Sequence, residues 1–136
     1  MTAQTLGRGT PKRDGSDFVD PVKAATTIYQ GSLVCLDAAG WAVPGSISAT
    51  LIARGVAKAT VVNPGANGAL SIETERGQAY RFANSAAADL IARTEIGKDV
   101  FIVDDQTVAK TNGGATRSIA GKCVDVDANG VWVRFS

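Results

Sequence analysis

The chain of 136 residues has no histidine, one methionine and only two cysteines. Without histidine it can form no Ser-His or Cys-His nucleophile pair and no zinc site with histidine ligands. Cys35 and Cys123 are far apart in the sequence, in the apolar stretches "SLVCLD" and "GKCVDV". This setting predicts two buried, reduced thiols. These absences argue against an enzyme, and we predict no catalytic, cofactor-binding or metal-binding residues.

The chain also lacks an excess of charge, because 14 Lys and Arg residues face 13 Asp and Glu residues. Binding to nucleic acid or to an acidic membrane surface requires a basic excess, so neither partner is expected. No apolar run reaches the roughly 20 residues of a membrane span. The opening "MTAQTLGRGTPKRDGSD" has no apolar core of a secretion signal. We therefore expect a protein that is made in a cytoplasm.

The first 20 residues are rich in Gly and Pro and show neither strand nor helix periodicity. They predict an extended arm over 1–20, followed by a single domain over 21–136. Fully stretched, the arm would reach about 60 Å. Its cations Arg8, Lys12 and Arg13 precede Asp14, Asp17 and Asp20. The arm is either a solvated tail or a strap that becomes ordered on a partner.

From residue 25 onward, short apolar runs alternate with turn residues. A hairpin is expected around Asp37–Gly40, a bend or bulge at Gly55, and a turn from Asn63 to Gly68. Further strands are expected in "ALSIETERG", "QAYRFA", "KDVFIVDD", "TVAKT" and "KCVDVDANGVWVRF". This spacing predicts a mainly β fold, a small β-barrel or β-sandwich-like domain.

One short α-helix is expected in "ANSAAADLIARTEIG". Asn84 or Ser85 could cap its start, the alanine run favours helix, and Gly97 is its last plausible end. The aromatic side chains are spread along the chain, and Trp41, Trp132, Phe101 and Tyr29 are expected in the core. An exposed aromatic platform for sugars or bases is the alternative.

Two acidic stretches could suggest chemistry. Asp104 and Asp105 follow "VFIV" and are expected at the tip of a turn, because adjacent residues of a strand face opposite sides and seldom converge on one atom. "DVDANG", Asp125 to Gly130, matches the first half of a calcium loop. The twelfth position, which needs a bidentate Glu, is Ser136. The Asn-Gly pair predicts a hairpin turn instead.

The stretches "GSLVCLDAAGWAVP" and "GKCVDVDANGVWVR" resemble each other, each with Asp before a turn Gly and Trp after it. This similarity is either an internal repeat or the chemistry that hairpins share, and two short copies leave both interpretations open.

Three blocks together, "IYQGSLVCLDAAGWAVPG", "RFANSAAADLIARTEIGKDVFIVDDQTVAKT" and "AGKCVDVDANGVWVRF", resemble the head-decoration, or capsid cement, proteins of tailed bacteriophages, particularly Mu-like ones. The opening "RGTPKRDGS" is similar to the start of those proteins. The matching blocks cover most of the chain and carry no catalytic signature.

The resemblance implies a structural virion protein that binds the outer surface of an expanded phage head and resists the pressure of packaged DNA. It implies that the major capsid protein is the partner, that the protein self-associates as a homotrimer, and that the arm becomes ordered on the shell. The capsid-contacting candidates are then Arg8, Pro11, Lys12, Arg13 and Phe18. The alternative is an exterior β module that binds a ligand or carbohydrate without catalysis.

Overall fold

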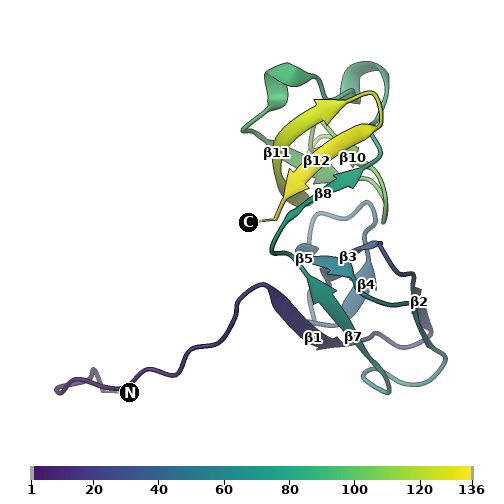
Figure 1. Cartoon of the computed structure of the whole chain (residues 1–136). Helices are drawn as coiled ribbons and strands as arrows, with labels where there is room; N and C mark the ends of the chain where they lie inside the picture. Colours follow the sequence, from purple (N-terminus) through teal and green to yellow (C-terminus); the bar gives the residue numbers. More distant parts are fainter. Residues whose placement is uncertain (1, 136) are drawn as a thin grey trace.

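The computed structural model describes residues 2–135 and confirms a mainly β fold (Figure 1). Its strands form three antiparallel sheets, and none of these sheets closes into a barrel. The two five-stranded sheets lie one above the other in Figure 1, as a first lobe over residues 17–75 and a second lobe over residues 79–135. Within residues 2–135, no helix is long and apolar enough to span a membrane.

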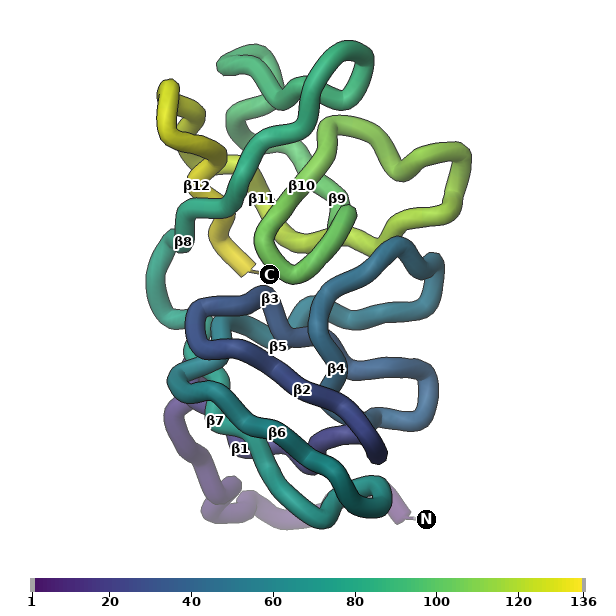
Figure 2. Tube along the Cα trace, turned by 90° about the vertical axis from the view of Figure 1, so that its right-hand side faces the viewer, coloured from purple at the N-terminus to yellow at the C-terminus, as the bar shows by residue number. Residues whose placement is uncertain are grey.

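The first lobe contains seven strands. Its sheet has the order β1-β7-β5-β3-β4. The strands are β1 (Asp17–Pro21), β3 (Leu33–Leu36), β4 (Ala42–Pro44), β5 (Ile52–Ala57) and β7 (Ser71–Glu75). A separate ribbon of β2 (Thr26–Ile28) and β6 (Val61–Asn63) covers this lobe and is seen in front of it in Figure 2. Ile28 and Val61 of the ribbon pack on the core around Val34 and Ile72.

The second lobe contains five strands in the order β10-β9-β11-β12-β8. They are β8 (Ala79–Phe82), β9 (Asp99–Ile102), β10 (Val108–Ala109), β11 (Ile119–Asp127) and β12 (Gly130–Arg134). The expected hairpins are present, since β3 pairs with β4, β9 with β10, and β11 with β12.

The two lobes have the same topology. When the five strands of each sheet are ranked in chain order, both sheets run first, fifth, fourth, second, third. Each lobe also has an isolated parallel bridge at the same place. In the first lobe it joins Val22, just after β1, to Ala42 of β4; in the second it joins Ala83, just after β8, to Thr107, just before β10. The chain therefore contains an internal structural repeat, of which each lobe is one copy.

A β-bulge recurs at the same place in both lobes. In the first lobe, Val34 pairs with Gly55 and the register then shifts; in the second, Val100 pairs with Gly121 across an equivalent shift. A Cβ on Gly55 would lie 2.4 Å from the carbonyl oxygen of Glu75, and one on Gly121 would lie 2.4 Å from that of Arg134. Both bulges therefore require glycine, as expected for Gly55.

The similarity between the two sequence hairpins has another origin. They form β3–β4 and β11–β12, which have different ranks in their lobes. What they share is turn chemistry, because Asp37 accepts hydrogen bonds from the amides of Ala39 and Trp41, and Asp127 accepts one from Asn129. The true partner of β3–β4 in the repeat is β9–β10.

The expected α-helix is wrong. The segment forms two 3-10 turns, η1 (Ala87–Asp89) and η2 (Arg93–Glu95). The Asn84 side chain bonds both the amide and the carbonyl of Ile91, at 2.9 and 2.8 Å, so it closes a loop instead of capping a helix. Ala87 adopts φ +54°, and no residue of η1 is buried. An alanine run without an apolar stripe gains too little from packing to hold a helix.

The bulge glycine of the second lobe can be tested by substitution. Gly121→Ala should lower the free energy of unfolding by roughly 2–3 kcal/mol, because the new methyl group meets a backbone carbonyl that cannot move freely. Gly9→Ala is the control, since nothing lies within 4 Å of its Cβ. Urea denaturation measures both, and equal midpoints for the two variants would contradict the steric requirement.

Candidate functional site

The N-terminal segment 2–16 is extended and contains no strand, and Figure 1 shows it running away from both lobes. Its side-chain hydrogen bonds are local, from Gln4 to Leu6 and from Ser16 to Asp14. Four of the five capsid-contacting candidates lie here with exposed side chains: Arg8, Pro11, Lys12 and Arg13. This segment is called the arm below.

Phe18, the fifth candidate, lies in β1 rather than in the arm. The guanidinium of Arg54 lies 3.6 Å from the centroid of its half-buried ring. The same guanidinium donates two hydrogen bonds to Asp20, at 2.7 and 3.1 Å. The sheet therefore begins at Asp17, and residues 17–20 of the expected arm are part of the first lobe. The structure assigns Phe18 a packing role in β1.

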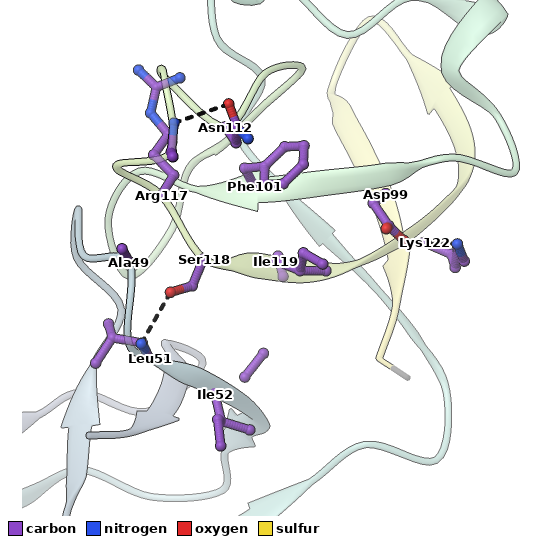
Figure 3. Close-up of a pocket in the computed structure, with 13 residues that line it drawn as sticks. Ala49, Leu51, Ile52, Asp99, Phe101, Asn112, Arg117, Ser118, Ile119 and Lys122 are labelled. Carbon is purple, nitrogen blue, oxygen red and sulfur yellow. Dashed lines mark hydrogen bonds and ion pairs between the residues drawn. The ribbon is translucent and has the colours of Figure 1, made fainter. Parts of the chain in front are cut away.

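A groove of about 750 Å³ lies between the lobes (Figure 3). Ile52 at the start of β5 and Ile119 at the start of β11 line it, with 64% and 48% of their surface exposed, and Phe101 of β9 lies beside them. The Ser118 hydroxyl joins the lobes at this groove, because it donates to the Ser48 carbonyl at 2.6 Å and accepts from the Leu51 amide at 3.0 Å.

The charged side chains of the groove are already paired. Lys122 lies 2.7 Å from Asp99, and Arg117 lies 3.2 Å from Asp89, outside the groove lining. Hydrogen bonding to Thr111 chiefly holds the pKa of Asp89 below its usual range, with Arg117 adding to the effect. An apolar floor with neutralised charges favours contact with an apolar or extended segment rather than acid–base chemistry.

The acidic stretches form turns, as the sequence predicts. Asp104 accepts a hydrogen bond from the Gln106 amide at 2.9 Å, and the carbonyl of Asp105 accepts one from the Leu33 amide at 2.8 Å. Asp127 accepts from the Trp132 indole at 3.0 Å and from the Asn129 amide, and these bonds hold its pKa below the usual range. Residues 2–135 contain no group of three or more side chains arranged to hold a metal ion.

The two thiols are buried, as predicted, with no exposed surface. Burial raises the pKa of Cys35 to about 12 and also raises that of Cys123. Both thiols are therefore protonated near neutral pH and behave as small apolar side chains.

The expected aromatic core is wrong for Tyr29, which is 62% exposed on the first lobe. Trp41, Trp132 and Phe101 are half-buried. Trp132 lies in the outer face of β12, where the guanidinium of Arg81 is 5.8 Å from its ring. The core consists instead of aliphatic residues with Phe82 and Phe135, because short strands of two small sheets leave space for β-branched side chains rather than for indoles.

Comparison with known proteins identifies no relative: no family model matches the chain, and no curated protein or solved structure matches it either.

The role of Arg54 in the first lobe gives a test of the boundary between arm and body. Arg54→Ala should lower the free energy of unfolding by about 2–3 kcal/mol, because it leaves Asp20 without its partner and removes the contact with Phe18. Arg8→Ala, in the arm, should change it by less than about 0.5 kcal/mol. Thermal and urea unfolding followed by circular dichroism measure both changes; a stable Arg54→Ala protein would show that β1 contributes little.

Proposed function

We propose that this protein is a capsid cement protein that binds the outer surface of an expanded phage head and stabilises it against the pressure of packaged DNA. The observation that carries the proposal is the arm, which extends from a well-packed two-lobed body, is exposed throughout residues 2–15 and presents Arg8, Lys12 and Arg13 to solvent. The sequence resemblance to the head-decoration proteins supports the same function.

The energetics of the arm support a large partner surface. Ordering its backbone costs roughly 1–2 kcal/mol per residue, which only an extended complementary surface can offset. Residues 2–13 contain three cations and no acidic residue, so that surface should be acidic or rich in backbone carbonyls. In the proposal the partner is the major capsid protein, and many copies acting together make modest contacts per subunit sufficient.

The body suits a structural role. Its short strands are held by antiparallel pairing and by a core that both lobes share. Its acidic turn residues are used by backbone amides, and its thiols are buried. In this proposal the protein is not an enzyme. It is made in the bacterial cytoplasm, is located on the outside of the virion and binds neither nucleic acid nor membrane.

The test is co-sedimentation of the purified protein with bare expanded shells and with unexpanded precursors. We expect saturable binding to expanded shells, and a loss of at least tenfold in affinity when residues 2–13 are deleted. The deletion ends there because Asp14 bonds Ser16 and β1 begins at Asp17, so the body stays complete. The matched control replaces residues 2–13 with a neutral Gly-Ser segment of equal length, which separates chain length from side-chain recognition.

Absence of binding to both kinds of shell would overturn the proposal. Unchanged binding of the deletion variant would overturn the role of the arm.

A second candidate is an exterior ligand- or carbohydrate-binding module, and the groove with its exposed Ile52 and Ile119 and half-buried Phe101 favours it. A glycan array with the full chain and with Phe101→Ala decides it. Binding that depends on Phe101 supports the candidate, and the absence of any bound sugar rejects a carbohydrate ligand.

A further inference from the structure

The groove lies on the face of the second lobe that is equivalent to a covered face of the first lobe. The equivalence follows from the two bulges, because the pair of Val34 and Gly55 matches the pair of Val100 and Gly121. Two cross-strand pairs flank the bulge in each lobe. They are Leu33–Val56 and Cys35–Ala53 in the first lobe, and Asp99–Lys122 and Phe101–Ile119 in the second.

In the first lobe this face is an interface. Its four residues pack in the cluster that both lobes share, together with aliphatic and aromatic side chains of the second lobe such as Val131, Val133 and Phe135. In the second lobe all four equivalent residues line the groove instead, and Ile119 is 48% exposed there (Figure 3). The fold therefore uses this face for apolar packing in one lobe and leaves it open in the other.

The groove is continuous with the contact between the lobes. Ala53 lies in its lining and also packs on the shared cluster, and Ile52 beside it is 64% exposed. Ser118 lines the groove and bonds Ser48 and Leu51 across the lobe boundary. A partner seated in the groove would extend an apolar interface that already exists, and the removal of exposed isoleucine surface from water would favour its binding.

The polar groups of the lining favour an apolar protein segment over a sugar. The Ser118 hydroxyl both donates and accepts within the chain, and Lys122 lies 2.7 Å from Asp99. The side-chain oxygen of Asn112 accepts from the Ala115 amide at 3.2 Å. A sugar, which is held by hydrogen bonds, would compete with these contacts, whereas an apolar segment leaves them intact.

A cement that resists pressure has to hold the shell at two separate places. The arm attaches the body at one point, and a single flexible attachment transmits no force between neighbouring shell subunits. A contact made by the body itself completes the connection. Because the arm raises the effective concentration of the body at that second contact, a weak apolar interface is sufficient.

We infer that the groove is this second contact and that an apolar β-segment of the major capsid protein occupies it. The inference rests on the proposed function and adds a binding surface on the body to the one on the arm. By equivalence with the first lobe, the segment presents aliphatic or aromatic side chains to Ile52, Ile119 and Phe101.

The experiment places a charge in the groove and measures shell binding. Ile119→Asp and Ile52→Asp each put a carboxylate where the apolar segment would pack. Val62→Asp is the matched control, since Val62 is 57% exposed on β6 and lies outside the groove lining. In co-sedimentation with bare expanded shells we expect at least tenfold weaker binding for each groove variant and wild-type binding for Val62→Asp. Circular dichroism verifies that each variant is folded.

A second measurement identifies the occupant without a charge in the groove. The photoreactive residue benzoylphenylalanine replaces Ile119 in one protein and Val62 in another, and both are irradiated on expanded shells. We expect a cross-link from position 119 to an apolar peptide of the major capsid protein, at least tenfold more abundant than from position 62. A cross-link to a highly charged peptide, or equal yields from the two positions, would overturn the inference.

The outcomes separate this inference from the proposed function. A wild-type protein that does not sediment with expanded shells overturns the proposed function and the groove contact with it. Wild-type sedimentation together with unchanged binding of both groove variants overturns the groove contact alone. A cross-link from position 119 to a second copy of this chain, or glycan binding that depends on Phe101, assigns the groove to another occupant and also overturns the inference.

Discussion

The packing of the first lobe on the second holds the molecule together. Leu33, Cys35 and Val56 belong to the sheet of the first lobe, yet they are buried in one cluster with core residues of the second lobe such as Val131 and Phe135. Burying a side chain of this size contributes about 1.5–3 kcal/mol, so these few residues are a large part of the marginal stability of a small domain. A hydrogen bond from the Leu33 amide to the Asp105 carbonyl joins the two lobes beside this cluster.

This packing also explains why the two copies of the repeat differ. In the first lobe the β2–β6 ribbon covers one side of the sheet, and the second lobe covers the other. In the second lobe the residues equivalent to Leu33, Cys35 and Val56 are Asp99, Phe101 and Lys122. These are half-buried residues that line the groove, and they need a mixture of charge and apolar surface because no further lobe covers them. Equivalent positions have therefore diverged according to what packs on them.

The candidate functional surfaces lie where the core places no demand on the side chains. Side chains of the arm and of the groove are not required by the core, and a partner could be recognised there.

The amino-acid sequence by itself determined the local features. Strand periodicity, the turn residues Asp37, Asp104 and Asp127, and the buried thiols could all be predicted, because they depend on neighbours along the chain. The bulge at Gly55 was also visible as a glycine within a β-branched run.

Only the tertiary structure decided the rest. The segment expected to be a helix forms a loop instead, which Asn84 closes by bonding Ile91. Phe18, expected in the arm, packs in β1 against Arg54, a residue far away in the sequence. The repeat could not be recognised, because among the residues aligned by strand register only Val34 with Val100 and Gly55 with Gly121 are identical. The physical reason is that a β topology requires only alternating burial and a few glycines, so two copies can keep the same fold while almost every side chain changes.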